Sequence, residues 1–155
     1  MIYLKLIVGF LIVFACTVLG RLKANGLKQK RDFFSYLEDF FIYLKREISF
    51  SSASVYEAVR AYSCPLEDLT LMLKSFLDGE LCVPSYLSSN ERDFICKFFK
   101  KIGRSDKNNE LELISFYIEE IGKMKMAENF KHSKFSRIYV KIGFFVGMIV
   151  FVVVL

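Results

Sequence analysis

The chain has 155 residues, of which 54% are hydrophobic and 25% are charged, and its formal net charge is +5. This length fits a single domain, and the presence of only two Pro and eight Gly excludes a disordered or fibrous chain. One His leaves little material for a His-based metal or acid/base site. A mean hydropathy of +0.34 beside so many charges predicts that the apolar residues are concentrated in a few segments.

The first such segment, residues 2–20, is an apolar run that only Lys5 interrupts. As a helix it would extend roughly 28 Å at ~1.5 Å per residue, close to the hydrocarbon thickness of a bilayer. A secretory signal peptide is the alternative, but charge follows the run directly and no small-residue cleavage site is present. We therefore interpret residues 2–20 as an uncleaved transmembrane helix.

The middle region shows helical patterns. Apolar residues spaced by three and four predict an amphipathic helix that ends at Ile48. The hydroxyls of residues 49–52 are expected to break this helix and to cap the next one, which carries an apolar face from Val55 to Tyr62. Pro65 is expected to open a third helix that stops at residues 78–79, and residues 80–89 are expected to form a loop.

Two further helices are expected after this loop. Ser89 and Asn90 are predicted to cap the first of them, and Gly103 to end it in the left-handed conformation. Ser105 and Asp106 are predicted to cap the last helix, which has apolar residues at positions 111, 114, 118 and 121.

The last helix has no breaker beyond position 126, so we expect it to continue toward or into residues 138–155, a second apolar run that only Lys141 interrupts. We interpret residues 138–155 as a second transmembrane helix. No segment alternates with a period of two. The predicted fold class is therefore all-α: N-terminal and C-terminal transmembrane helices flank a helical bundle at residues 21–137.

Basic residues are clustered on the inner side of both apolar runs, at positions 21–31 and 123–137. By the positive-inside rule, this pattern predicts a cytoplasmic middle region in contact with anionic membrane lipid and two termini on the other side. A nucleic-acid groove is the alternative explanation of the net charge. All 17 acidic residues lie in the middle region and nearly balance its basic residues, so no nucleic acid is expected as a partner.

Three short stretches carry a resemblance to a known family: Leu-Lys-Arg-Glu-Ile at 44–48, Tyr-Glu-Ala at 56–58 and Ile-Gly-Arg-Ser-Asp at 102–106. Together with the two apolar ends, they make the chain similar along its whole length to the stage III sporulation protein AB family of endospore-forming Firmicutes. The most specific element is the Gly-x-Ser-Asp turn between the last two helices. The chain departs from the family pattern at Glu110, where a Gln is expected.

The resemblance implies a non-enzymatic membrane platform or scaffold in the transport complex built between mother cell and forespore. The bundle would lie in the mother-cell cytoplasm and be similar to the cytoplasmic domains of type II secretion and type IV pilus platform proteins. Its partners would be other stage III sporulation subunits, including the stage III sporulation protein AA ATPase. Two roles toward the ATPase are open: transmission of its motion, or static recruitment to the membrane. A platform-like subunit of another type II secretion or pilus-related machine is the alternative.

The candidate partner-binding or structural residues are Glu47, Glu57, Gly103, Ser105 and Asp106. The last two have two compatible roles, as a helix cap and as part of a tip that contacts a partner. A different class of function, a membrane-bound enzyme or sensor, would use the carboxylates of Glu47, Glu57 and Asp106.

No catalytic residue, metal site, cofactor or small-molecule substrate is predicted. His132 is alone in a basic polar stretch and is expected to be a solvated residue of the last helix. Glu112, Glu119 and Glu120 share a helix, but no His joins them, which favours a charged surface over a metal site. Residues 103–105 lack the spacing of a phosphate-binding loop, so ATP hydrolysis is not expected.

Gly143 and Gly147 form a G-x-x-x-G pattern within the second apolar run. Two small residues at this spacing let helices approach closely in lipid. They are candidates for packing against the first apolar helix or against another subunit.

Overall fold

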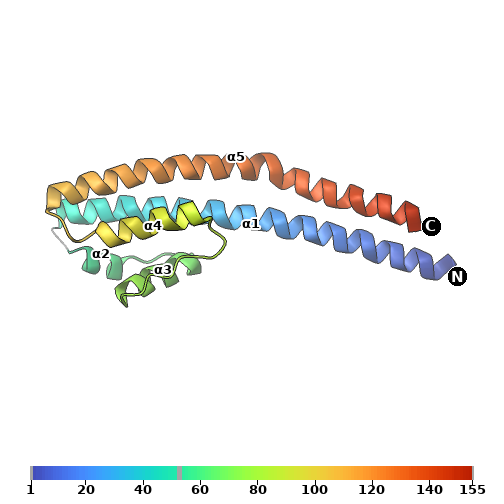
Figure 1. Cartoon of the computed structure of the whole chain (residues 1–155), viewed down its shortest axis with the longest axis horizontal. Helices are drawn as coiled ribbons and strands as arrows, with labels where there is room; N and C mark the ends of the chain where they lie inside the picture. The colour runs from blue at the N-terminus through green and yellow to red at the C-terminus, as the bar shows by residue number, and fades with distance from the viewer. Residues whose placement is uncertain (1, 52–53, 155) are drawn as a thin grey trace. The chain divides into compact units, whose positions relative to one another are not determined.

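The described part of the chain forms five α-helices and no strand in a computed structural model, which confirms the all-α prediction. The helices are α1 (Ile2–Phe50), α2 (Val55–Ala61), α3 (Glu67–Leu77), α4 (Ser89–Lys101) and α5 (Lys107–Val154) (Figure 1). The structure describes the backbone of residues 2–51 and 54–154. It does not describe the side chains of residues 2–10, 12, 23–24, 135–137, 139–140, 143–144, 147, 151 and 153–154.

The chain divides into two compact units, one made of Met1–Arg31 with Ala127–Leu155 and the other of Asp32–Met126. In the first unit, residues 2–20 and 138–154 are helical, and α5 runs without a break into the second apolar run as expected. Over the residues that the structure describes, no helix offers an apolar stretch long enough to cross a bilayer. The transmembrane assignment of residues 2–20 and 138–155 therefore stays a prediction.

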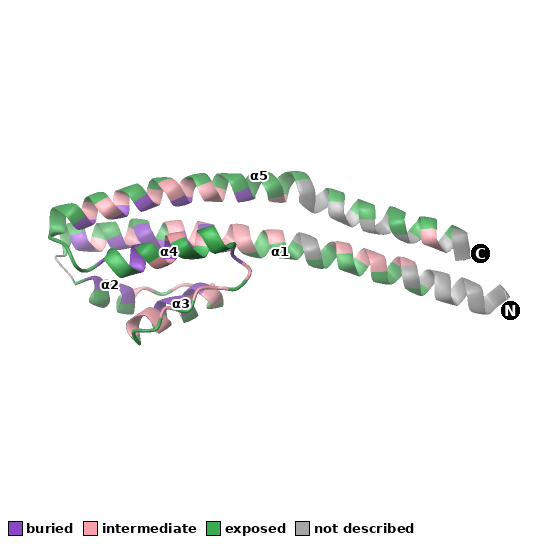
Figure 2. Cartoon of the chain, viewed as in Figure 1, coloured by how far each residue is buried: buried purple, intermediate pink, exposed green. Residues whose placement is uncertain are grey.

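The hydrophobic core lies in the Asp32–Met126 unit. The three-four spacing predicted for α1 is confirmed, because the apolar residues of this stripe are all buried: Phe33, Leu37, Phe40, Phe41, Leu44 and Ile48. Figure 2 shows buried positions along this part of α1 in purple. Aromatic rings join α1, α4 and α5: the ring centroid of Phe98 lies 4.2 Å from that of Phe41 and 4.9 Å from that of Tyr117. Such pairs add about 0.5–1.5 kcal/mol each to the free energy of burying the rings.

The start of α2 corrects a prediction. Residue 50 is still helical, so the hydroxyls of residues 49–52 do not cap α2; Ser54 does. The Ser54 side chain accepts a hydrogen bond from the Glu57 backbone N–H at 3.3 Å, and the Glu57 carboxylate accepts from the Ser54 backbone N–H at 2.9 Å. This reciprocal capping box satisfies two N–H groups that the helix itself leaves unpaired, which is why Ser54 determines where α2 begins.

The start of α4 shows the same correction by one residue. Ser88 caps the helix, whereas Ser89 and Asn90 already lie inside its first turn. The Glu91 carboxylate accepts the Ser88 backbone N–H at 2.8 Å, which completes a second capping box. In both cases the Glu three residues later selects which of the neighbouring hydroxyl residues becomes the cap.

The segments around α3 differ in a smaller way from prediction. Pro65 does not open the helix, because Leu66 holds the N-cap position and α3 begins at Glu67. The loop expected after α3 is confirmed, and it is packed against the bundle. Leu87 is buried, and the Tyr86 hydroxyl donates a hydrogen bond to the Asp68 carboxylate at 2.9 Å. Burial, the Asp68 hydrogen bond and the Asp68 charge all raise the pKa of Tyr86.

Candidate partner-binding site

Three segments that carry predicted site residues meet at one end of the Asp32–Met126 unit: the end of α1, the start of α2 and the α4–α5 turn. The Lys107 ammonium donates a hydrogen bond to the Ser49 carbonyl at 2.9 Å, which joins α5 to the end of α1. A Cβ placed on Gly103 would lie 3.8 Å from the Val55 Cβ, so the turn also packs on α2. The structure thus gathers the segments that hold Glu47, Glu57 and residues 103–106.

The turn between α4 and α5 follows from its sequence. The Ile102 N–H donates to the Phe98 carbonyl at 2.9 Å and closes α4, and Gly103 then adopts a φ of 79°. A left-handed residue at this position was predicted and is confirmed. A side chain in this conformation costs about 1–2 kcal/mol, whereas Gly adopts it without a Cβ clash.

The start of α5 depends on Asp106. Its carbonyl accepts the Glu110 N–H at 3.0 Å, which is the first hydrogen bond of the helix, and its carboxylate accepts from the Asn109 side-chain amide. Ser105 is exposed and makes no hydrogen bond with a described residue. Asp106 thus stands immediately before α5, but its carboxylate bonds the Asn109 side chain and no backbone N–H of the described residues, so the predicted side-chain cap is not seen; Ser105 is left available at the surface.

The two glutamates of the candidate site have local partners. The Glu57 carboxylate is held in the α2 capping box, and its hydrogen bonds with the backbone and hydroxyl of Ser54 lower its pKa. The Glu47 carboxylate lies 3.8 Å from the Arg46 guanidinium. No hydrogen bond or ion pair joins Glu47, Glu57 and Asp106 to one another, all three being described residues. The structure therefore does not assemble these carboxylates into one bonded cluster.

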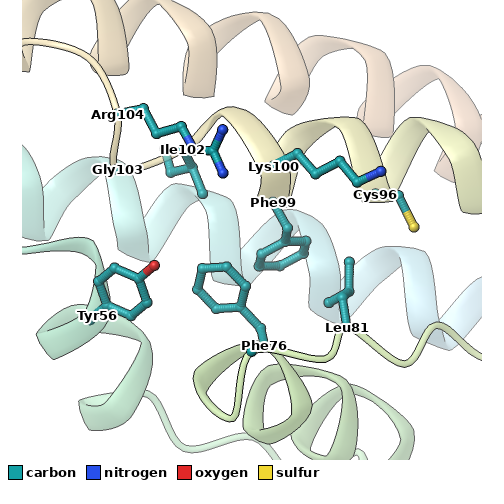
Figure 3. Close-up of a pocket in the computed structure, with 10 residues that line it drawn as sticks. Tyr56, Phe76, Leu81, Cys96, Phe99, Lys100, Ile102, Gly103 and Arg104 are labelled. Atoms are coloured by element: carbon teal, nitrogen blue, oxygen red, sulfur yellow. The ribbon is translucent and has the colours of Figure 1, made fainter.

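A groove of about 460 Å³ adjoins this turn. Its wall and floor are aromatic. The Tyr56 ring stacks on the Phe76 ring with their centroids 5.5 Å apart and an interplanar angle of 4°, and the centroids of the Phe76 and Phe99 rings are 4.8 Å apart. Figure 3 shows the rings of Phe76 and Phe99 in the middle, Tyr56 on one side and Leu81 on the other. The remaining lining residues are Gly79, Cys96, Lys100, Ile102, Gly103 and Arg104.

The charged residues that line the groove are both basic. Lys100 and Arg104 are exposed and make no ion pair with any carboxylate in the described part of the chain. Three acidic residues adjoin lining residues in sequence, Glu57 beside Tyr56 and Asp78 and Glu80 on either side of Gly79, but none of them lines the groove. The groove therefore combines an apolar aromatic floor with two unpaired cations, Lys100 on α4 and Arg104 in the turn after it.

Sequence reasoning identified parts of this groove without recognising it. The three-four spacing of apolar residues in the sequence places Phe76, Phe99 and Ile102 on apolar helix faces, and Gly103 was a candidate residue. Lys100 was missed. The signal that it offered is the run of basic residues along α4 and the following turn, at positions 97, 100, 101 and 104.

The other unit contains a charged cluster that the sequence analysis did not predict. Glu128 is buried, and its carboxylate lies 2.8 Å from the Lys131 ammonium and 3.4 Å from that of Lys30. His132 is partly exposed, and its Nδ1 lies 3.4 Å from Nη1 of Arg31. No group of three or more His, Cys, Asp or Glu among the described residues is arranged to hold a metal ion.

Gly143 and Gly147 lie within α5, but their surroundings are outside what the structure describes. Their role in helix packing stays a prediction.

Comparison with known proteins identifies a family. The family model described as Stage III sporulation protein AB matches residues 5–78 and 79–155. No curated protein matches the chain, and no solved structure matches it either. The matched ranges contain the stretches at 44–48, 56–58 and 102–106, and they include every residue that lines the groove.

Proposed function

The chain belongs to the stage III sporulation protein AB family, and from this membership we propose that it is a membrane-anchored platform subunit of the stage III sporulation complex. It binds other subunits and catalyses no reaction. The observation that carries the proposal is the family match over essentially the whole chain. The family is one of sporulation proteins, which favours this role over a subunit of an unrelated secretion or pilus machine.

The two apolar runs are the membrane anchors in this proposal. Residues 2–20 and 138–155 are apolar in sequence, and residues 2–20 and 138–154 belong to α1 and α5, the helices that also supply Phe41 and Tyr117 to the core. The basic residues on the inner side of each run support a location of the bundle in the mother-cell cytoplasm. Each such residue near an anionic leaflet contributes about 1 kcal/mol to membrane attraction.

The end of the bundle that carries residues 103–106 is the proposed contact with the stage III sporulation protein AA ATPase and other subunits. Two features support this assignment. The Lys107–Ser49 hydrogen bond and the packing of Gly103 on Val55 hold this end together, so it offers a fixed surface. Ser105 is exposed at its tip and has no bonded partner in the described part of the chain.

Binding to the ATPase tests the contact. The full chain, purified in detergent micelles, is expected to co-purify with the ATPase, and Ser105→Arg is expected to weaken the interaction at least about tenfold, or about 1.4 kcal/mol. Ser85→Arg, at an exposed position in the loop after α3, is the matched control and should bind as the wild type does. A folded chain that does not bind the ATPase removes this partner, and equal effects of the two variants remove this surface.

Alkaline carbonate extraction of membranes from sporulating cells tests the anchors. The wild-type chain is expected to stay in the membrane pellet, and the double variant Leu11→Arg and Ile149→Arg to be released, because a charge in the hydrocarbon costs about 2.5–3.5 kcal/mol per residue. Leu71→Arg, on the exposed side of α3, makes the same chemical change outside the anchors and should have no effect. Extraction of the wild-type chain by carbonate would contradict integral membrane anchoring.

A further inference from the structure

We propose that the groove between α2, α3 and α4 binds an acidic peptide segment of a partner protein, with an apolar side chain of that segment inserted against Phe76 and Phe99. The inference rests on the proposed function in one respect, that the chain acts by binding other proteins. It adds a specific surface and the chemistry of its ligand. The occupant follows from the charge and the shape of the groove.

The charge of the groove selects an acidic ligand. Lys100 and Arg104 both line it, both are exposed, and neither has an ion-pair partner among the described residues. No carboxylate lines the groove. An incoming Asp or Glu would therefore meet two unpaired cations, whereas a basic segment would meet like charge. The Arg guanidinium also suits a carboxylate because it can donate two parallel hydrogen bonds.

The apolar part of the groove selects a side chain such as Leu or Phe. Phe76 and Phe99 form an aromatic surface, and Leu81 continues it along one side (Figure 3). Tyr56 forms the wall while 53% of its surface stays exposed, so the groove is open and does not enclose a small molecule. Tyr and Arg beside an apolar pocket are the residue types that dominate protein–protein binding energy.

The position of Lys100 near the end of α4 has a second explanation, since cations at a helix C-terminus interact favourably with the helix dipole. This explanation applies equally to Lys101, which is the last residue of α4 and does not line the groove. It does not apply in the same way to Arg104, which lies beyond the helix. Lys101 is therefore a matched control: the same charge reversal perturbs the same helix end but leaves the groove intact.

The test uses the full chain in detergent micelles and a phage-displayed library of random dodecapeptides. Selected peptides are expected to be enriched in Asp and Glu around a Leu or Phe, and to be displaced by salt, which screens exposed charges. Fluorescence anisotropy then gives the affinity of a selected peptide for each variant. The double variant Lys100→Glu and Arg104→Glu, and separately Tyr56→Ala, are expected to weaken binding at least about tenfold, whereas Lys101→Glu stays within about twofold.

Four results would overturn the inference: no peptide is selected, the selected peptides lack acidic residues, Lys101→Glu weakens binding as much as the groove variants do, or Tyr56→Ala has no effect. Circular dichroism of each variant checks that it is folded, and Lys100→Gln with Arg104→Gln replaces the charge reversals if these disturb the fold. The ATPase experiment on the same preparations separates the two proposals. ATPase binding without acidic-peptide selection refutes the groove inference alone, and peptide binding without ATPase binding refutes the ATPase contact alone.

Discussion

Gly103→Ala tests whether the α4–α5 turn needs Gly for its backbone or for space. The φ of 79° places residue 103 in the left-handed region, where an L side chain costs about 1–2 kcal/mol. The space around it is not the obstacle: an added Cβ would lie 3.8 Å from the Val55 Cβ and 4.0 Å from the Tyr56 ring, which are ordinary contact distances. The expected loss of stability is therefore about 1–2 kcal/mol, all of it from the backbone.

Gly79→Ala is the matched control for this substitution. Gly79 has a φ of 89° and nothing within 4 Å of an added Cβ, so it has the same backbone cost without any neighbour. The two variants are expected to lose stability within about 0.5 kcal/mol of each other, since both costs come from the same conformation.

Thermal unfolding of the full chain in micelles, followed by circular dichroism, measures both losses. For a chain of 155 residues each kcal/mol lowers the Tm by about 2–4 °C. A loss for Gly103→Ala several kcal/mol larger than that for Gly79→Ala would refute the argument, because the turn would then be limited by space. A loss for neither variant would show that the left-handed conformation is not required.

Three further variants probe the core and the charged groups. Phe98→Ala removes a fully buried ring and should lower the free energy of unfolding by about 3–5 kcal/mol. Phe116→Ala, at a position that is 55% exposed, should change it by no more than about 0.5 kcal/mol. Equal Tm shifts of the two variants would contradict the described core. Because the pKa of Glu57 is lowered from 4.5 in the folded state, its contribution to stability is present above about pH 4.5 and is lost as the pH falls through the folded value. Glu57→Gln should therefore weaken the dependence of Tm on pH below 4.5, and an unchanged acid profile would count against the capping box. Glu128→Gln removes the charge that pairs with Lys30 and Lys131 and should lower the free energy of unfolding by about 1–3 kcal/mol. Glu119→Gln, at an exposed position, should lower it by less than about 1 kcal/mol. A larger loss for Glu119→Gln would contradict the burial of Glu128.

The helix starts could have been predicted more closely from the sequence. Ser54 and Ser88 each stand three residues before a Glu, and this spacing defines a capping box. The expectation that residues 49–52 or Ser89 would cap relied on the hydroxyls alone. Where the local rule was complete, as for Gly103 after the apolar end of α4, prediction and structure agree.

The groove could not be predicted in the same way, because it depends on which helices pack together. Periodicity places Phe76 on an apolar face of α3 and Phe99 on an apolar face of α4. It does not determine that these two faces meet, with the ring centroids 4.8 Å apart. Glu128 shows the same limit, since its ion pair with Lys30 joins α5 to a residue of α1 far away in sequence.

The groove and the α4–α5 turn share residues and depend on the same contacts. Gly103 ends α4, and the same residue faces Val55 and Tyr56 in the first turn of α2. The capping box between Ser54 and Glu57 determines where that first turn begins, so it also determines where Tyr56 stands beside the groove. The helix cap at Ser54 and the turn at Gly103 therefore position Tyr56, the aromatic wall of the groove. This explains how residues 56–58 and 102–106 can contribute to a binding surface although their hydrogen bonds are made within their own segments.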